Sequence, residues 1–546
     1  MEIHELQQLL SEMSLQEKIG QMVQLTGVYF DKEAVLTGVV GEQLPPEWII
    51  QYAGSVLGVI GKDKIYDIQS RYMEQHPHHI PLLFMADVIH GCRTIFPIPL
   101  GQACSFHPEL VSEAASIAAS EASSEGLRAT FSPMIDVSRD PRWGRMMESF
   151  GEDPYVNGIM GKAMVDGYQQ KDDAGIAACL KHFAGYGAVN AGREYNDVEI
   201  SKRTFLEQYV KPFRMALKAK PAMVMTAFNA IDRKPISGNK ELLKGLLRDK
   251  EGFEGTVISD WGSIGQLEEQ GVAADMEEAA IQASEAGVDI DMMSPAYMLC
   301  LEKLVESGKI PKAFVDESAF RVLMMKNQLG LFENPFAGLG KSGKLTLHNR
   351  EKAYQMAGES CVLLKNEKKI LPLSVKKKVI WAGPYTASRE LLSRWSIFGE
   401  HEAVETIEDV LQKKQIEAEC ITGCNILSEE ECKVWQVEQE LSDKPRDEQW
   451  LETITHEDTV VCVLGEHESQ SGEAASRAFL TLPEEQQVLF EKIAERTSNI
   501  VTVVITGRPL DLRRISERSK AVIMAWRPGT MGACLLYTSD AADEAR

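Results

Sequence analysis

The sequence has no long apolar run. No stretch approaches the roughly 18 residues that a membrane-spanning helix requires. The opening segment, Met1 to Gln8, is polar and acidic, which is not the pattern of a secretory signal peptide. These absences predict a cytoplasmic protein with no membrane partner.

Positive charge is also scarce. The chain has 58 lysines and arginines against 81 aspartates and glutamates, a formal net charge of −23 at pH 7. Because binding to a phosphate backbone needs a basic surface, we expect no nucleic-acid partner. Anionic substrates would be repelled as well, so a neutral ligand is the natural expectation.

Cysteine and histidine follow no metal-binding pattern. The ten cysteines occur without CxxC or Cys/His spacing, which indicates neither a zinc site nor a disulfide framework. His76, His78 and His79 cluster in a predicted loop, where no carboxylate or cysteine stands at ligand spacing. We therefore expect no metal site.

Short apolar runs alternate with helical segments through the first part of the chain. Apolar spacing over residues 6–25 is helical, and Ser14 and Glu17 can form a capping box. Seven later runs have the length and composition of buried strands: 54–60, 80–87, 128–137, 175–183, 222–228, 255–260 and 287–293. This pattern favours an α/β fold with a (β/α)8-barrel-like N-terminal domain over residues 1–345.

A glycine-rich stretch, 336–344, predicts a linker between domains. It contains a GxGxxG string, but no strand precedes it, so nucleotide binding is not indicated. Five further strands are expected in a parallel core, over residues 376–382, 418–422, 459–465, 500–506 and 521–525. Residues 346–533 therefore predict an α/β sandwich domain.

Polar side chains gather where the strands of the first domain should end. They are Asp87, Asp136, Lys181, His182, Asp260, Asp289 and Asp291. Active sites lie at this face of (β/α) barrels, and doubly wound sheets bind ligands there too. Asp260 is the most informative, because Trp261 follows it directly and a buried charge is costly unless it is paired or functional. A carboxylate beside an aromatic plane suits a nucleophile that attacks a sugar, although an Asp here could also be a helix N-cap.

Three other segments carry candidate chemistry. Arg145 ends a loop dense in Arg, Asp and Trp, and its planar guanidinium suits carboxylates or vicinal hydroxyls. Lys181 could donate hydrogen bonds to a neutral ligand, form a Schiff base, or only neutralise a buried carboxylate. Glu473 stands in a polar loop of the second domain and could supply a general acid, although such loops are often only solvated surface.

Six segments together resemble glycoside hydrolase family 3, in particular its bacterial β-glucosidase branch. They occur in family order: Met85-Ala-Asp-Val-Ile-His-Gly91, Asp136-Val-Ser-Arg-Asp-Pro-Arg-Trp-Gly-Arg145, Lys181-His-Phe-Ala-Gly-Tyr-Gly-Ala188, Met225-Thr-Ala-Phe-Asn229, Val257-Ile-Ser-Asp-Trp261 and Ser471-Gly-Glu-Ala-Ala-Ser-Arg477. The resemblance spans roughly residues 15 to 529. Each motif alone is weak, but six in order are specific.

The resemblance implies a retaining exo-β-glycosidase that needs no cofactor. Asp260 would be the nucleophile and Glu473 the general acid/base. The residues implied to bind the sugar are Asp87, Arg145, Lys181 and His182 for its hydroxyls and Trp261 for its ring, with Phe228 and Trp395 lining the pocket. Neighbouring positive charge should keep Asp260 ionised, and a less polar loop should raise the pKa of Glu473.

The substrate is less well defined. In the branch of the family that cleaves N-acetylglucosaminides, a histidine follows the Lys-His-Phe motif, but here the loop reads Ala184-Gly-Tyr-Gly-Ala188. β-Glucosidase is therefore favoured, while β-xylosidase and arabinosidase stay open. A Schiff-base aldolase using Lys181 and an inactive sugar-binding fragment are alternatives from other classes.

The end of the chain departs from the family pattern. Residues 534–546 resemble the translation of a sequencing adapter, so we expect a non-native tail and an incomplete second domain. Such a truncation would leave apolar surface and an unpaired sheet edge exposed.

Overall fold

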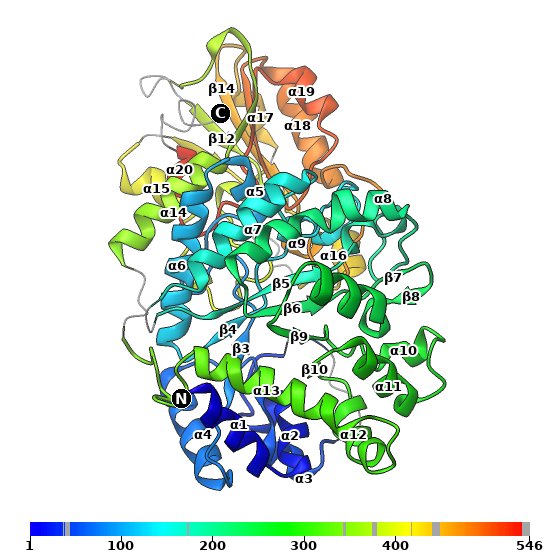
Figure 1. Cartoon of the computed structure of the whole chain (residues 1–546). Helices are drawn as coiled ribbons and strands as arrows, with labels where there is room; N and C mark the ends of the chain where they lie inside the picture. Colours follow the sequence, from blue (N-terminus) through cyan, green and yellow to red (C-terminus); the bar gives the residue numbers. More distant parts are fainter. Residues whose placement is uncertain are drawn as a thin grey trace.

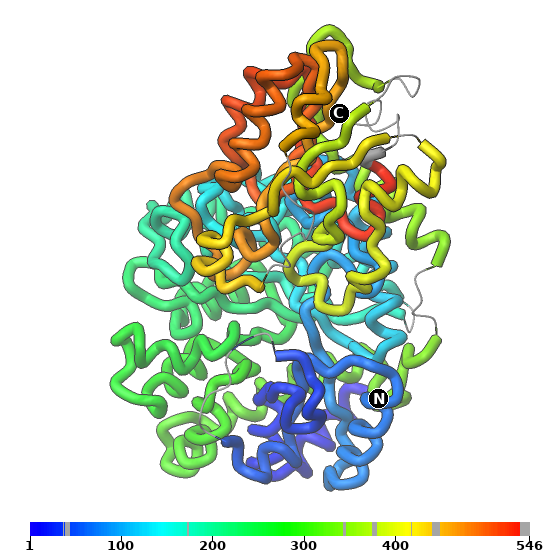
Figure 2. The backbone as a smooth tube through the Cα atoms, turned by 180° about the vertical axis from the view of Figure 1, so that it is seen from behind, coloured from blue at the N-terminus to red at the C-terminus, as the bar shows by residue number. Residues whose placement is uncertain are grey.

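A computed structural model describes residues 1–36, 38, 44–171, 174–341, 346–373, 379–416, 418–438 and 448–537. Two large sheets organise most of these residues, and they occupy opposite ends of the molecule (Figure 1). The view from behind shows the N-terminal half at one end and the segments from about residue 400 onward at the other (Figure 2).

The first sheet is a nearly closed parallel barrel. Its order within the described residues is β10-β1-β2-β3-β4-β5-β6-β9, and an isolated parallel bridge between Ile258 and Ile290 joins the two ends. The strands are β1 (Val23–Thr26), β2 (Ser55–Leu57), β3 (Leu83–Ala86), β4 (Ala129–Thr130), β5 (Ala177–Phe183), β6 (Met223–Thr226), β9 (Thr256–Ile258) and β10 (Asp291–Met292). The barrel is confirmed, with one strand more than the seven predicted.

The additional strand is β1. The helical spacing predicted over residues 6–25 is interrupted twice, giving α1 (Ile3–Glu12), α2 (Leu15–Gln21) and then β1. The Ser14 and Glu17 capping box forms as expected and restarts the chain as α2. β1 pairs with β2 and β10, so tertiary pairing overrides the local helical pattern.

Helices cover the outside of the barrel. In chain order they include α3 (Glu47–Tyr52), α4 (Lys62–Gln75), α6 (Pro108–Ser124), α7 (Pro154–Tyr168), α9 (Lys211–Ala216), the π-helix Glu241–Lys250, α11 (Met276–Ala286), α12 (Ala296–Glu306) and α13 (Lys312–Gln328). Residues 336–341 of the predicted linker form turns on the barrel, where the Gly340 amide donates to the Ser124 carbonyl; residues 342–345 lie outside the described part.

The second sheet has six described strands in the order β11-β16-β15-β14-β12-β13. They are β11 (Val362–Asn366), β12 (Val379–Ala382), β13 (Glu419–Ile421), β14 (Thr459–Gly465), β15 (Ile500–Ile505) and β16 (Ala521–Met524). The five predicted strands are parallel and confirmed, whereas β11 was not predicted and pairs antiparallel with β16. The flanking helices include α14 (Leu347–Ser360), α15 (Ile407–Lys413), α18 (Glu484–Arg496), α19 (Arg513–Arg518) and α20 (Gly532–Tyr537).

The last described helix, α20, bears on the predicted tail. It packs against α14 and α15, and Leu535 is fully buried. The first residues of the segment 534–546 are therefore part of the folded domain. Residues 538–546 lie outside the described part, so the expectation for them stays a prediction.

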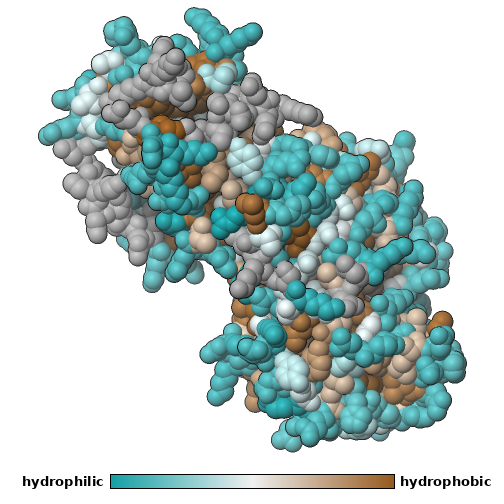
Figure 3. All heavy atoms as spheres, turned by 90° about the vertical axis from the view of Figure 1, so that its left-hand side faces the viewer, coloured by the Kyte–Doolittle hydropathy of each residue, from teal (hydrophilic) through white to brown (hydrophobic). Residues whose placement is uncertain are grey.

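The two domains share a hydrophobic core. Ile98 and Met147 from barrel loops pack in one cluster with Leu464, Val504 and Trp526 from the second domain. Hydrophilic side chains cover most of the face drawn in Figure 3, as the large fraction of charged residues predicts. Among the described residues, no helix is long and apolar enough to cross a membrane.

Candidate active site

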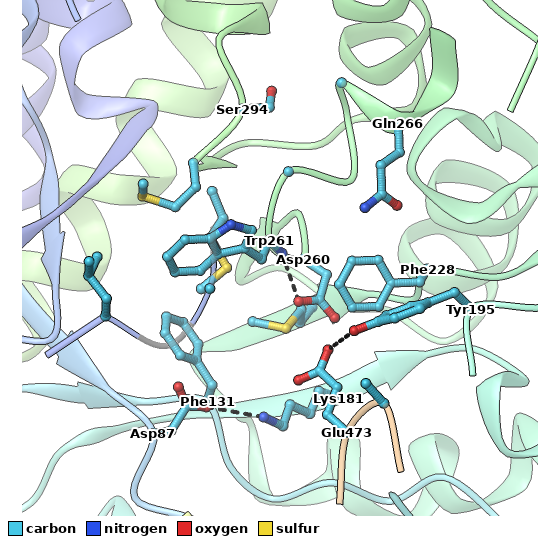
Figure 4. Close-up of a pocket in the computed structure, with 18 of the residues that line it drawn as sticks. Asp87, Phe131, Lys181, Tyr195, Phe228, Asp260, Trp261, Gln266, Ser294 and Glu473 are labelled. Carbon is cyan, nitrogen blue, oxygen red and sulfur yellow. Dashed lines mark hydrogen bonds and ion pairs between the residues drawn. The ribbon is translucent and has the colours of Figure 1, made fainter. Parts of the chain in front are cut away.

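A cavity of about 1490 Å³ lies where the barrel strands end and the second domain begins. Eight of the nine predicted site residues line it: Asp87, Arg145, Lys181, Phe228, Asp260, Trp261, Trp395 and Glu473. Figure 4 shows most of them converging on one space, with Glu473 arriving on a loop from the second domain. His182, the ninth, is not among the lining residues.

Asp260 lies immediately beyond β9 and is buried. Its Oδ1 accepts a hydrogen bond from the Trp261 amide at 2.7 Å, so the predicted pair does form one local unit. Burial raises the pKa of Asp260 to about 7, and the charge of Glu473 adds to this, against the opposing charges of Arg145 and Lys181.

Glu473 follows β14 on a loop that touches the barrel. Tyr195 Oη donates to its Oε1 at 2.7 Å, and Arg145 Nη1 lies 3.5 Å from the same oxygen. Burial alone would raise the pKa of Glu473, but the Arg145 charge and the Tyr195 hydrogen bond together lower it.

The predicted order of these two pKa values is therefore wrong. Asp260 is the more completely buried carboxyl, so loss of hydration dominates it. Glu473 is only partly buried and stands against the guanidinium. The loop supplying Glu473 is not a less polar environment, because the barrel surface opposite it provides both a cation and a hydroxyl.

Arg145 is held by its own neighbour. Its Nε and Nη2 donate to the two carboxylate oxygens of Glu148 at 2.9 and 3.0 Å, and both side chains are buried. This bidentate pair fixes the plane of the guanidinium and leaves Nη1 directed at Glu473. Trp143 of the same loop is fully buried rather than facing the cavity, and donates to Glu194.

Lys181 and Asp87 form a buried ion pair in the cavity wall. Lys181 Nζ lies 3.2 Å from Asp87 Oδ1, and 5.4 Å from the centre of the Trp395 ring. Burial raises the pKa of Asp87, against the charge of Lys181. The pair offers an ammonium donor and a carboxylate acceptor side by side, which suits adjacent hydroxyl groups.

His182 lies behind Asp260. Its Nδ1 is 2.8 Å from Asp136 Oδ2, and its Nε2 is 3.4 Å from Asp260 Oδ2. Burial and the charges of Arg145 and Lys181 hold the pKa of His182 well below its usual value. Its ring nitrogens face two carboxyl groups and it does not line the cavity, so its expected role as a ligand of a sugar hydroxyl stays a prediction.

Several lining residues were not predicted. Tyr195 and Arg394 are the most important, since Tyr195 binds Glu473 and Arg394 Nη1 donates to the Glu473 carbonyl at 2.7 Å. Both lie in irregular segments without apolar periodicity, so no strand end marked them. Their arginine and tyrosine side chains are common on surfaces, and only the fold brings them to the cavity.

A carboxylate, that of Glu17, lies beside the histidines of the 76–79 loop. Ligand atoms of Glu17, His76 and His78 lie within 4.8 Å of one another, so the expectation that none was near is wrong. Two contacts already link these groups, because His78 Nδ1 is 2.6 Å from Glu17 Oε1 and His76 Nδ1 accepts from the His78 amide. Sequence spacing missed Glu17 because it comes from α2, far away in the chain.

Two family models match the chain. The glycosyl hydrolase family 3 N-terminal domain matches residues 14–325, and the glycosyl hydrolase family 3 C-terminal domain matches residues 361–536. The chain belongs to glycosyl hydrolase family 3. It is a glycoside hydrolase, as the motifs in the sequence predict.

Relatives in this family carry two kinds of name. The periplasmic beta-glucosidase of Salmonella typhimurium is 35% identical over 547 residues, covering 96% of this chain and 70% of the relative. A putative beta-xylosidase of Formosa agariphila is 32% identical over 558 residues, covering 95% and 70%. The crystal structure of a beta-glucosidase from Listeria innocua in complex with isofagomine has a TM-score of 0.89 and 39% identity, covering 99% of this chain and 74% of that one.

These comparisons leave two expectations unconfirmed. The C-terminal family model extends to residue 536, so a truncated second domain is not supported. The Salmonella relative is named as periplasmic, so a cytoplasmic location is not confirmed.

Proposed function

We propose that this glycoside hydrolase is a retaining, exo-acting β-glucosidase that removes terminal β-D-glucosyl residues from neutral β-glucosides. The observation that carries the proposal is the meeting of Asp260 and Glu473 in one cavity, although they come from different domains. A retaining enzyme needs two carboxyl groups that act together, one as nucleophile and one as acid and then base.

In the proposed mechanism Asp260 attacks the anomeric carbon while Glu473 protonates the departing oxygen. This gives a glucosyl ester on Asp260 and a free aglycone. Glu473 then takes a proton from water, which attacks the same carbon and releases glucose with retained configuration. The Trp261 amide holds Asp260 Oδ1, and Tyr195 holds Glu473 Oε1, so each carboxyl group has a fixed oxygen.

The other lining residues suit a neutral sugar. Asp87, Lys181 and Arg145 would bind the hydroxyl groups of the sugar to be released, and Trp261 would pack on its ring. Phe228 and Trp395 complete the wall, with Phe228 in edge contact with Tyr195. The negative charge of the whole chain is compatible with a neutral substrate.

Glucose is favoured over xylose by the relatives whose structures are known. The Listeria innocua beta-glucosidase was crystallised with glucose, and a mutant of it with laminaribiose. β-Xylosidase is the second candidate, because relatives with that name match most of the chain. N-acetylhexosaminidase activity has less support, because the loop after Phe183 has no histidine and a carboxyl group from another loop, Glu473, lines the cavity.

Lys181 is better placed to bind than to form a Schiff base. Its ammonium group is 3.2 Å from Asp87 Oδ1 and 5.4 Å from the centre of the Trp395 ring, so it is held in the cavity wall as a hydrogen-bond donor. An aldolase would instead be detected by trapping a substrate on Lys181 with borohydride.

The test is covalent trapping. Incubation with a 2-deoxy-2-fluoro-β-glucoside with a good leaving group should add one fluoroglucosyl group to Asp260, as seen by peptide mass spectrometry. Turnover of aryl β-glucoside should exceed that of the matching xyloside and N-acetylglucosaminide. Stabilisation by glucose without labelling or turnover would support an inactive sugar-binding protein and overturn the proposal.

A further inference from the structure

Three groups stand in a row behind the floor of the cavity. The His182 ring bridges Asp136 and Asp260, with Nδ1 2.8 Å from Asp136 Oδ2 and Nε2 3.4 Å from Asp260 Oδ2. The backbone amide of His182 also donates to Asp136 Oδ2 at 2.9 Å. All three residues are buried, and the ring is fixed edge-on against Tyr186.

The buried polar atoms of these three side chains form fewer hydrogen bonds than they could. Within the described part of the chain, Asp136 Oδ1, His182 Nε2 and Asp260 Oδ2 have no hydrogen bond of ordinary geometry. A neutral imidazole carries one proton, so it can donate to only one of the two carboxyl groups. If Nδ1 holds the proton, the Nε2 lone pair faces Asp260, which must then be protonated to make a bond.

We propose that Asp136 and His182 form a proton relay that lets Asp260 ionise without releasing a proton to water. This proposal rests on the proposed function, in which Asp260 must be ionised to attack. In the first arrangement Asp260 donates a proton to His182 Nε2, and His182 Nδ1–H donates to ionised Asp136. In the second arrangement the proton of Asp260 has moved to His182 Nε2, and the proton of His182 Nδ1 has moved to Asp136. The Asp260 O–H and Nδ1–H bonds have broken, and the Nε2–H and Asp136 O–H bonds have formed.

The balance of protons and charge is the same in both arrangements. Two protons are shared among three groups, and a single negative charge moves from Asp136 to Asp260. Burial raises the pKa values of both Asp136 and Asp260 to about 7, so either carboxyl group can hold the proton near neutral pH. A movement of a few tenths of an ångström would bring Nε2 within ordinary hydrogen-bond distance of Asp260.

Charged groups surround the relay on every side. Those that act on it are Arg145 and Lys181 at both ends, Glu148 at Asp136 and Glu473 at Asp260. The two cations disfavour a permanently charged imidazolium, which would otherwise satisfy both carboxylates. The proton must therefore move through a neutral ring. Asp136 and His182 are positioning residues in this scheme, because neither lines the cavity.

Asp136→Asn separates the relay from a simple charge effect. The His182 amide requires an acceptor at the Oδ2 position, so the asparagine must place its oxygen there. That oxygen also fixes the proton on Nδ1, and the Nε2 lone pair then opposes ionisation of Asp260. If Asp136 acted only as a buried negative charge, its removal would have the opposite effect and make ionisation easier.

The experiment uses a Glu473→Gln background and 2,4-dinitrophenyl 2-deoxy-2-fluoro-β-D-glucoside. Dinitrophenolate leaves without a proton, so the rate of labelling at each pH follows the fraction of Asp260 that is ionised. We expect Asp136→Asn to shift the acidic limb of the pH–rate profile upward by about one pH unit. At pH values below this limb, labelling should be at least about 10-fold slower than with Asp136 intact. An acid limb that is unchanged or lower would overturn the relay.

Asp291→Asn is the matched control. Asp291 is also a buried carboxyl whose pKa burial raises to about 7, but its Oδ2 accepts from Ser294 and Tyr297 instead of the relay. The Asp291→Asn variant should have a lower melting temperature, but the acidic limb of its pH–rate profile should not move. If the enzyme with intact Asp136 is not labelled on Asp260 at any pH, the proposed function fails, and the relay is then judged by the next measurement.

Histidine ¹⁵N spectra of the wild-type enzyme test the relay without any substrate, and they serve if Asp136→Asn does not fold. The His182 signals are assigned by their loss in His182→Gln. We expect both ring nitrogens to be partly protonated through exchange, and only Nδ1 to be protonated in Asp136→Asn. A proton confined to Nδ1 in the wild type near neutral pH would overturn the proposal.

Discussion

Arg145 Nη1 lies 3.5 Å from Glu473 Oε1, and this contact joins the barrel to the second domain at the proposed general acid. The other two nitrogens of the guanidinium are committed to Glu148. Arg145 therefore cannot follow Glu473 if the loop moves away, and the contact reports how closely the loop is docked.

The first prediction concerns pH. Burial raises the pKa of Asp260 to about 7, while the Arg145 charge and the Tyr195 hydrogen bond lower the pKa of Glu473, so below about pH 7 a proton favours Asp260 over Glu473. Catalysis needs it on Glu473, so the active form is a minority. Above about pH 7 that proton is lost altogether, and kcat/KM for an alkyl β-glucoside should fall.

The Glu473→Gln variant should show the opposite slope. Labelling by the dinitrophenyl fluoroglucoside needs only ionised Asp260, so its rate should rise with pH to a plateau. Removing the Glu473 charge also lowers the pKa of Asp260, so this rise should be centred below the fall seen in the wild type. Labelling independent of pH from about 5 to 8 would contradict the raised pKa of Asp260.

The second prediction concerns the role of Glu473 itself. Glu473→Gln should lower kcat/KM for alkyl β-glucosides by about 10²–10⁴-fold, while dinitrophenyl glucosides should form the covalent intermediate with a much smaller loss. Glu468→Gln is the control, because Glu468 is on the same loop but does not line the cavity. Equal losses for both leaving groups would remove Glu473 from the role of acid.

The third prediction concerns Arg508, which is fully buried beneath the Glu473 loop. Its guanidinium donates to the carbonyl oxygens of Gln470 and Ala475, on either side of Glu473, and to that of Pro141 in the barrel. Arg508→Lys keeps the charge but loses the planar fork. Hydrolysis of alkyl β-glucosides should fall much more than dinitrophenyl labelling of Asp260.

Calorimetry should accompany that assay. Arg508→Lys should lower the melting temperature by at least about 4 °C, because several buried carbonyl groups lose their donor. Arg513→Lys, at an exposed arginine paired with Asp511, should change neither the melting temperature nor the hydrolysis of alkyl β-glucosides. Parallel losses of hydrolysis and labelling would mean that Arg508 supports the whole fold and not the acid loop in particular.

The fourth prediction uses the Asp87–Lys181 pair. Lys181→Met should leave Asp87 as an uncompensated buried carboxyl, lowering both stability and kcat/KM, the latter by about 100-fold or more. Adding Asp87→Asn should recover part of the stability but none of the activity, if both groups bind the sugar. Recovery of activity in the double variant would reduce the pair to a structural role.

The sequence predicted the position of most cavity residues because parallel strands bring their ends to one face. Asp87 and Asp260 follow β3 and β9, and both reach the cavity. β1 was missed because Val23–Thr26 continues the apolar spacing of the helix before it. Its identity as a strand depends on partners that are distant in the sequence.

The pKa values of the site residues could not be predicted from the positions of the strand ends. Tyr195 and Arg145 set the pKa of Glu473, yet neither is near it in the chain. The sequence also places Lys181 and His182 side by side without indicating which one meets the substrate. In the structure Lys181 lines the cavity and His182 contacts Asp136 and Asp260 behind it.

The division of the two carboxyl groups between domains also sets an order during synthesis of the protein. The barrel and Asp260 leave the ribosome first and can fold as a unit before the second domain exists. Glu473 emerges much later, and Arg508, which anchors its loop, later still. The nascent chain would thus carry the proposed nucleophile Asp260 without the proposed proton donor Glu473, and glycosidase activity would begin only when the last strands of the second sheet are in place.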